Sequence, residues 1–174
     1  SLLNQSFKDF LWIVLDDGST DNTEKVVENF QLLNPFFEII YKKDKNRHKF
    51  LTVLKGIKMV QTPYFMVVDS DDIYPENSLE TLISEVEKIK NQDDYISVMG
   101  LSADENGKIV GNQYPNNGFD GSIFEMRYKH NVRGDKFGIF ITKTYQREIS
   151  GKDFSQYEGK GYIPQSVIFN EYDA

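Results

Sequence analysis

Two short apolar runs are each followed at once by a cluster of aspartates, and this pairing constrains the fold more than any other feature. Residues 10–15 (F-L-W-I-V-L) lead into Asp16 and Asp17, and residues 64–68 (Y-F-M-V-V) lead into the sequence D-S-D-D. A continuous apolar run of this length, bounded by turn residues, is typical of a strand buried on both faces of a parallel sheet. The chain is therefore expected to build its sheet from these two runs.

Helix signals alternate with the strand signals in the first half of the chain. Asp21 is a good N-cap for a first helix, which is expected to end at Asn34-Pro35. A strand is expected at residues 37–41, and apolar spacing predicts further helices at residues 51–60 and 75–91. This βαβαβα order predicts an α/β fold with a mostly parallel, Rossmann-like sheet.

The second half follows a different pattern, typical of a smaller irregular α+β part. Strands are expected at residues 95–101 and 137–141, and Asn106-Gly107 is a hairpin turn signal that predicts a partner strand at residues 109–114. Without a repeat or a linker-like stretch, residues 1–174 are expected to form one domain with two halves, 1–92 and 93–174.

Charge and composition exclude several classes of function. The 174 residues carry 20 basic and 27 acidic side chains, a formal net charge of −7, which argues against binding to nucleic acid. The chain contains no cysteine, so disulfides, thiolate metal sites and cysteine nucleophiles are excluded. No apolar run approaches the ~20 residues that span a bilayer.

The two acidic clusters predict a cation site. The carboxyl ends of parallel strands meet at one edge of a sheet, where ligands bind. Asp16, Asp17, Asp69, Asp71 and Asp72 would repel one another there, and Mg²⁺ or Mn²⁺ with oxygen ligands would offset that repulsion. The alternative for each cluster is turn and helix-cap chemistry, since D-D-G-S-T-D is also typical of a tight turn that enters a helix.

Taken together, these motifs resemble the bacterial family 2 inverting glycosyltransferases, which have the GT-A fold. The resemblance is carried by residues 1–7 (S-L-L-N-Q-S-F), 16–23 (D-D-G-S-T-D-N-T), 55–57 (K-G-I) and 69–72 (D-S-D-D). It implies that residues 1–92 bind a nucleotide sugar and that residues 93–174 face the acceptor. The family opens with a strand that precedes Ser1, so the resemblance predicts a sheet without its first strand.

The family resemblance assigns roles to single residues at the donor site. Asp16 and Asp17 match the acids that hold the nucleoside, and Asp69 and Asp71 match the D-x-D pair that reaches the ribose and the metal. Asp72 either adds a metal ligand or caps the turn. Lys49, with Arg47, lies in a loop expected at residues 42–49, which in the family passes close to the nucleotide, and a solvated basic loop is the alternative for both.

The catalytic base is less well defined by the sequence. Inverting enzymes of this type use a carboxylate to deprotonate the acceptor hydroxyl, and Gln165 stands where that acid is expected. Glutamine cannot act as a base, so Glu158, Asp153 and Asp135 are the substitutes, each with a plain surface role as the alternative. A sugar-nucleotide-binding module with impaired catalysis is therefore the second hypothesis, and a nucleotidyltransferase is the third.

The resemblance also implies partners and a location. The donor is expected to be a nucleotide sugar, with a UDP-sugar favoured, and the acceptor a glycan or a lipid-linked glycan. The divalent cofactor would be Mg²⁺ or Mn²⁺. The expected location is the cytoplasm, and peripheral association with the inner face of the membrane is compatible with the resemblance.

Overall fold

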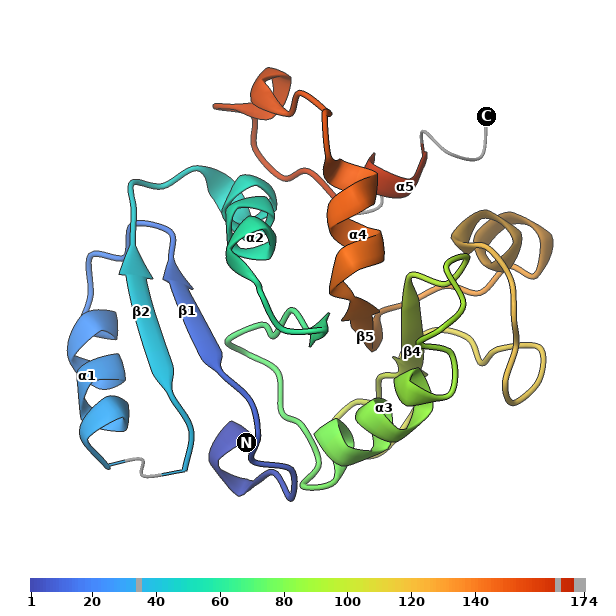
Figure 1. The fold of residues 1–174 in the computed structure, drawn as a ribbon, viewed down its shortest axis with the longest axis horizontal. Coiled ribbons are helices and arrows are strands. Elements are labelled where there is room, and N and C mark those ends of the chain that lie inside the picture. The colour runs from blue at the N-terminus through green and yellow to red at the C-terminus, as the bar shows by residue number, and fades with distance from the viewer. Residues whose placement is uncertain (34–35, 165–166, 171–174) are drawn as a thin grey trace.

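A parallel strand pair opens the fold, as the alternating strand and helix signals of residues 10–41 predict. The computed structural model describes residues 1–33, 36–164 and 167–170. Strand β1 (Trp12–Asp16) pairs in parallel with β2 (Ile39–Lys43), and helix α1 (Thr23–Leu33) connects them (Figure 1). The register runs from Trp12 opposite Ile39 to Asp16 opposite Lys43. The first βαβ unit is thereby confirmed.

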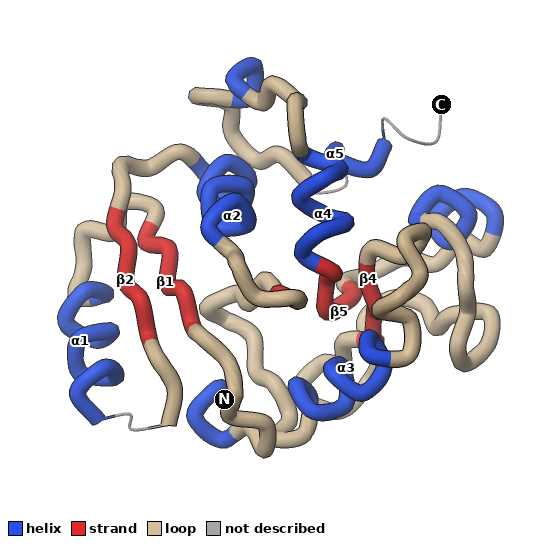
Figure 2. Tube along the Cα trace, in the orientation of Figure 1, coloured by secondary structure: helices blue, strands red, loops and turns tan. Residues whose placement is uncertain are grey.

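The next strand joins a separate sheet. Strand β3 (Tyr64–Phe65) is shorter than the expected 64–68 and pairs antiparallel with β5 (Lys136–Ile141). Strand β4 (Ser97–Leu101) lies on the other side of β5, again antiparallel. The α/β class is confirmed, but the parallel sheet has two strands, and a three-stranded antiparallel sheet stands apart from it (Figure 2). An apolar run predicts burial of a strand without specifying its partner, which is why the sequence did not predict this separation.

The remaining helices complete the arrangement in Figure 1, with α2 and α4 lying between the two sheets. The longer ones are α2 (His48–Met59), α3 (Ser78–Glu87) and α4 (Thr142–Ile149). Short helical segments occur at Leu2–Asn4, Glu125–Lys129, Ser155–Tyr157 and, as α5, Val167–Asn170. Among the described residues, no helix combines the length and apolar character needed to cross a membrane.

The expected hairpin forms only at its turn. Gly107 adopts φ +78°, and Asp104 N–H donates to the Lys108 carbonyl at 2.8 Å. A single antiparallel bridge joins Ala103 to Ile109, but residues 109–114 form no strand. Gly111 diverts the chain there, because it adopts φ +79° and packs its backbone against Gly134.

Two apolar clusters hold the elements in place. One lies around α2 and α4 and includes Phe50, Leu54, Ile57, Tyr145 and Ile149. The other lies between α3 and β5 and consists of Leu82, Val86, Ile139 and Ile141. Helix α2 approaches β1 so closely at Gly56 that an added Cβ would stand 2.4 Å from Leu15 Cδ1. Because α2 is fixed against both clusters and β1, its N-terminal end has a defined position beside the first acidic cluster.

Candidate functional site

Asp16, at the end of β1, is buried and already satisfied within the chain. Its Oδ1 accepts a hydrogen bond from Ser19 N–H at 2.6 Å, its Oδ2 accepts one from the Tyr41 hydroxyl, and only 4% of the residue is exposed. Burial raises the pKa of Asp16, but the hydrogen bonds from Tyr41 and Ser19 outweigh it, so the net pKa is lowered. The Asp16 carboxylate therefore holds the turn after β1 in shape.

Asp17 faces the start of α2. Its Oδ1 accepts hydrogen bonds from the backbone N–H of Arg47 at 2.8 Å and from the Thr52 hydroxyl at 2.6 Å. Gly18 adopts φ +86° and packs so closely on the Asn46 backbone that an added Cβ would lie 2.8 Å from Asn46 N. Asp17 Oδ2 has no hydrogen-bond partner in the part of the chain that the structure describes, so this oxygen can accept a hydrogen bond from a ligand.

The second acidic cluster is linked to α2 by Lys49. Lys49 lies in the first turn of α2, not in the predicted loop, and its ammonium pairs with the Asp69 carboxylate. Asp72 N–H donates to the Asp69 carbonyl at 3.3 Å, and the Tyr74 hydroxyl donates to Asp72 Oδ2 at 3.4 Å. Asp71 is exposed, and its carboxylate has no ion-pair or hydrogen-bond partner within the ranges that the structure describes.

The chemistry of this donor set fits a divalent cation shared with a ligand. Among residues 1–33, 36–164 and 167–170, no group of three or more acids or histidines is close enough to hold a metal by itself. Mg²⁺ in phosphate-transfer sites needs only one or two carboxylates, because phosphate oxygens and water complete its shell. Asp71 is the free carboxylate for that purpose, with Asp72 beside it and Asp69 tied to Lys49.

Gln5 holds the segment after the second acidic cluster in place, a role that the sequence did not predict. It is 1% exposed, and its Nε2 donates to the carbonyls of Pro75 at 2.7 Å and Tyr74 at 3.3 Å. Its Oε1 accepts from Leu79 N–H at 3.0 Å, in the first turn of α3. Gln5 thereby anchors the chain directly after the second acidic cluster. A single buried glutamine leaves no periodic pattern, and only the family resemblance of residues 1–7 distinguishes this segment in the sequence.

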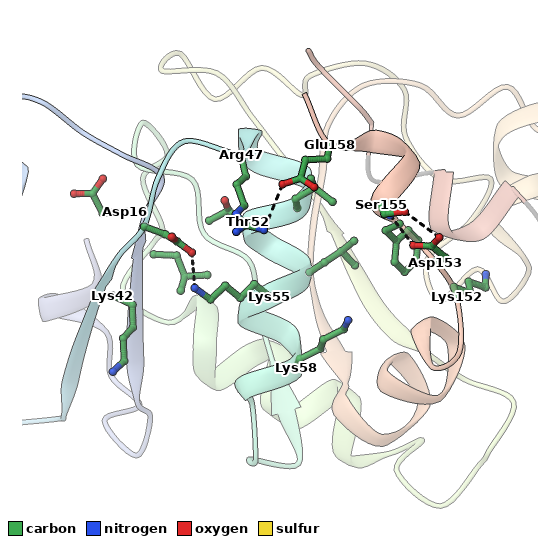
Figure 3. Close-up of a pocket in the computed structure, with 15 residues that line it drawn as sticks. Asp16, Lys42, Arg47, Thr52, Lys55, Lys58, Lys152, Asp153, Ser155 and Glu158 are labelled. Atoms are coloured by element: carbon green, nitrogen blue, oxygen red, sulfur yellow. Dashed lines mark hydrogen bonds and ion pairs between the residues drawn. The ribbon is translucent and has the colours of Figure 1, made fainter. Parts of the chain in front are cut away.

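A cavity of about 380 Å³ lies along α2, with residues at the ends of β1 and β2 on one side and residues from the segment 152–158 on the other (Figure 3). Asp16 lines one side of it, and Glu158 lines the other. The Arg47 guanidinium reaches Glu158 across the top of α2, with Arg47 Nη1 and Glu158 Oε1 3.7 Å apart. Arg47 Nε is buried and donates no hydrogen bond to the described residues. Two predicted site residues from distant parts of the sequence therefore share this cavity.

Asp135 lies away from these contacts but at the same end of the antiparallel sheet as the second acidic cluster. Because β5 runs antiparallel to β3, residue 135 enters β5 where the chain leaves β3 towards Asp69. The rings of Tyr74 and Phe137, whose centroids are 4.4 Å apart, hold the two segments together. Asp135 itself is exposed, and its carbonyl accepts a hydrogen bond from Lys136 Nζ at 3.3 Å. Gln165 lies outside the described residues.

Three of the predicted donor-site residues are joined by one short stretch. Residues 47–52 contact Asp17 through Arg47 and Thr52, and they contact Asp69 through Lys49. The structure therefore links the two acidic strand ends, although the strands belong to different sheets. Asp135 is not brought into this network.

Comparison with known proteins finds glycosyltransferases. The chain is 28% identical over 123 residues to the glycosyltransferase GlyG of Streptococcus pneumoniae, which covers 71% of this chain and 36% of that protein. It is 29% identical over 136 residues to a glycosyltransferase of Haemophilus influenzae, covering 75% of this chain and 39% of the relative. It is 32% identical over 104 residues to the GalNAc(5)-diNAcBac-PP-undecaprenol beta-1,3-glucosyltransferase of Campylobacter jejuni, covering 58% and 31%.

The chain thus spans about a third of the length of these relatives. The family model described as glycosyl transferase family 2 matches residues 1–151, which include both acidic clusters, Gln5 and the whole of α2. With the two clusters joined through residues 47–52 and this match over most of its length, the chain belongs to glycosyl transferase family 2.

Proposed function

We propose that this chain binds a nucleotide-diphosphate sugar and transfers the sugar to an acceptor hydroxyl with inversion. The observation that carries the proposal is the link between Asp17 and Asp69 through residues 47–52. A nucleotide sugar needs one group for its nucleoside and another for its diphosphate, held at a fixed separation. The start of α2 fixes that separation here.

The proposed roles follow from the carboxylate oxygens that have no partner among the described residues. The unpaired oxygen of Asp17 binds the nucleoside, while Asp16 keeps the turn in place from its buried position. Asp71, with Asp72 or Asp69, holds Mg²⁺ or Mn²⁺ against the diphosphate. When bound, the cation stabilises the negative charge that develops on the leaving nucleoside diphosphate. The Lys49 ammonium neutralises Asp69 and so reduces the repulsion between the acids.

The acceptor step requires a base. The acceptor oxygen forms a bond to the anomeric carbon, the bond from that carbon to the diphosphate breaks, and the hydroxyl proton passes to a carboxylate. Glu158 is the base we propose, because Arg47 orients it beside the residues that hold Asp17. Asp135 is the alternative base. Gln165 supports the second candidate function, a binding module with impaired transfer, since an amide cannot take up the proton.

The partners in this proposal are a UDP-sugar donor and a glycan or lipid-linked acceptor. The name of the Campylobacter jejuni relative describes a substrate linked to PP-undecaprenol, and that relative covers 58% of this chain. A lipid-linked acceptor would bring the reaction to the inner face of the membrane, from the cytoplasm. Binding to nucleic acid forms no part of the proposal, given the net charge of −7.

Calorimetric titration of UDP, and then GDP, with Mn²⁺ and after chelation tests the donor site. UDP is expected to bind only with the metal, and Asp71→Ala is expected to weaken binding at least about tenfold by removing a metal ligand. Asp94→Ala, an exposed aspartate outside the site, is the matched control and should bind like the unsubstituted chain. Binding that is indifferent to chelation, or equal in the two variants, would contradict the metal-dependent donor site.

Donor hydrolysis and sugar transfer then separate the two candidate functions. Release of UDP from a UDP-sugar that is lost in Glu158→Gln supports the enzyme, with Glu158 as its base. Tight, metal-dependent UDP binding without turnover supports the binding module.

A further inference from the structure

The cavity beside α2 carries a row of cations along one helix face. Arg47, Leu51, Lys55 and Lys58 line it. Within α2, a spacing of four and three residues places Leu51, Lys55 and Lys58 on the same face, and Arg47 directly precedes the helix. The seven residue steps from Leu51 to Lys58 correspond to roughly 10 Å of helix. Lys42 from β2 stands on one side of this row and Lys152 on the other (Figure 3). We call this feature the lysine groove.

Most of the acids in the lysine groove are already engaged. Asp44 pairs with Lys55 at 2.6 Å, and Glu158 pairs with Arg47. The Asp153 carboxylate accepts from Ser155 N–H at 2.8 Å and from its hydroxyl at 2.9 Å, and the buried Asp16 is held by its own turn.

Two cations therefore remain for a ligand. Lys42 and Lys58 are exposed, and neither has a hydrogen-bond or ion-pair partner in the part of the chain that the structure describes. The lining contains five cations and four acids, so the lysine groove has a small positive excess in a chain whose net charge is −7.

Apolar side chains also line the lysine groove, and we call them its apolar base. They are Leu15, Leu51, Leu54 and Phe154, and Phe154 is fixed edge-on against Phe50 with ring centroids 5.8 Å apart. Sugars present C–H faces that pack on such surfaces, and phosphates bind ammonium groups. A volume of about 380 Å³ suits a ligand of one or two sugar rings with a phosphate.

The lysine groove is separate from the proposed donor site but adjoins it at Arg47. Asp17, Lys49, Asp69 and Asp71 do not line it. Arg47 belongs to both, because its backbone N–H holds Asp17 and its guanidinium meets Glu158 at the edge of the groove. A ligand in the groove would therefore end beside Glu158, where the acceptor hydroxyl must lie.

We propose that the lysine groove binds a phosphate group of the acceptor, so that the acceptor is a sugar or glycan that carries phosphate. The identification of the ligand as the acceptor rests on the proposed function, whereas the binding of an anion rests on the geometry of the groove alone. Lys42 and Lys58 bind the phosphate, and the apolar base takes the adjoining ring.

Inorganic pyrophosphate, titrated into the purified protein without divalent metal, is the direct probe. Lys42→Glu and Lys58→Glu are each expected to weaken its binding by about fivefold, more at low salt than at 0.5 M, because exposed charges are screened. Lys25→Glu, on α1 and outside the groove, makes the same change in net charge and should bind as the unsubstituted protein does. Circular dichroism checks that each variant is folded. Equal affinities in all three variants, or no binding at all, would overturn the inference.

A parallel titration of UDP with Mn²⁺ separates this inference from the proposed function. The lysine variants are expected to keep the UDP affinity of the unsubstituted protein, and a parallel loss of UDP and pyrophosphate binding would assign the groove to the donor and overturn the inference. If UDP fails to bind while pyrophosphate binding still depends on Lys42 and Lys58, the donor assignment fails and the anion site stands.

Two organic probes then identify the source of the phosphate. Competition by geranyl diphosphate supports a lipid-linked diphosphate, and competition by glycerophosphoglycerol supports a phosphodiester glycan. If neither probe displaces pyrophosphate, the groove binds inorganic anions only, and the inference that it binds the acceptor is overturned.

Discussion

Replacing Gln5 with methionine removes three hydrogen bonds while keeping a side chain of similar length. The contact with Leu79 N–H matters most, because N–H groups in the first turn of a helix have no acceptor within the helix. Leaving this buried donor without a partner costs about 1–3 kcal/mol. Loss of the 2.7 Å bond to the Pro75 carbonyl adds about 1 kcal/mol, and that carbonyl keeps a second donor, Ser78 N–H at 3.0 Å.

The free energy of unfolding is therefore expected to fall by about 2–4 kcal/mol. With a typical urea dependence of ~2 kcal/mol/M, the midpoint of urea unfolding would decrease by about 1–2 M. Because Gln5 anchors the chain directly after the second acidic cluster, metal-dependent UDP affinity should fall as well. Circular dichroism and calorimetry measure the two effects.

Ser6→Ala is the matched control for Gln5→Met. The Ser6 hydroxyl donates to Glu80 Oε2 at 2.8 Å on the surface, and the Ser6 backbone bond to the Glu76 carbonyl survives the change. Its effect is expected to stay below about 0.5 kcal/mol. Equal midpoints for Gln5→Met and Ser6→Ala would refute the reasoning, because they would show that the buried amide does not hold α3 in place.

Two further substitutions test the site and the backbone. Tyr41→Phe deprives the buried Asp16 carboxylate of a hydrogen bond and is expected to cost about 1–3 kcal/mol near neutral pH. Because the pKa of Asp16 is lowered in the folded state, its contribution to the free energy of unfolding is fully present above pH 3.8 and is lost as the pH falls through the folded pKa. Tyr41→Phe should therefore move acid unfolding to higher pH, which a circular dichroism titration would detect. Gly134→Ala places a Cβ 2.5 Å from the Val110 carbonyl at φ +86°, whereas Gly118→Ala meets open space at φ +74°. Calorimetry should therefore show a loss of at least ~2 kcal/mol for Gly134→Ala and about 1 kcal/mol for Gly118→Ala, and similar losses would contradict the close approach.

Local patterns predicted the elements well. The apolar run before Asp16 and the cap at Asp21 specified β1 and the start of α1, because burial and helix capping depend on nearby residues. The turn after β1 and its acids were also evident, since Gly18 and its neighbours are turn residues. These features account for the α/β class and for the family.

The contacts between residues far apart in the chain could not be predicted from the sequence. The apolar run at Tyr64 could not specify that its partner would be β5, which lies more than 70 residues away and supplies antiparallel hydrogen bonds. The same holds for the links from Lys49 to Asp69 and from Arg47 to Glu158, because surface cations have many acids within reach in an unfolded chain. The roles of Asp135, Gln165 and the metal ligands, and the division at residue 92, stay predictions.

The two contacts of Arg47 have different tolerance to sequence change. Asp17 is held by the peptide N–H of residue 47, which every amino acid except proline provides. Glu158 is held by the guanidinium, which depends on the side chain. Evolutionary drift at position 47 could therefore alter the side of the molecule that faces Glu158 while the contact with Asp17 persists. With the roles proposed for Asp17 and Glu158, substitution at this one position would change the acceptor side and leave the nucleoside contact in place.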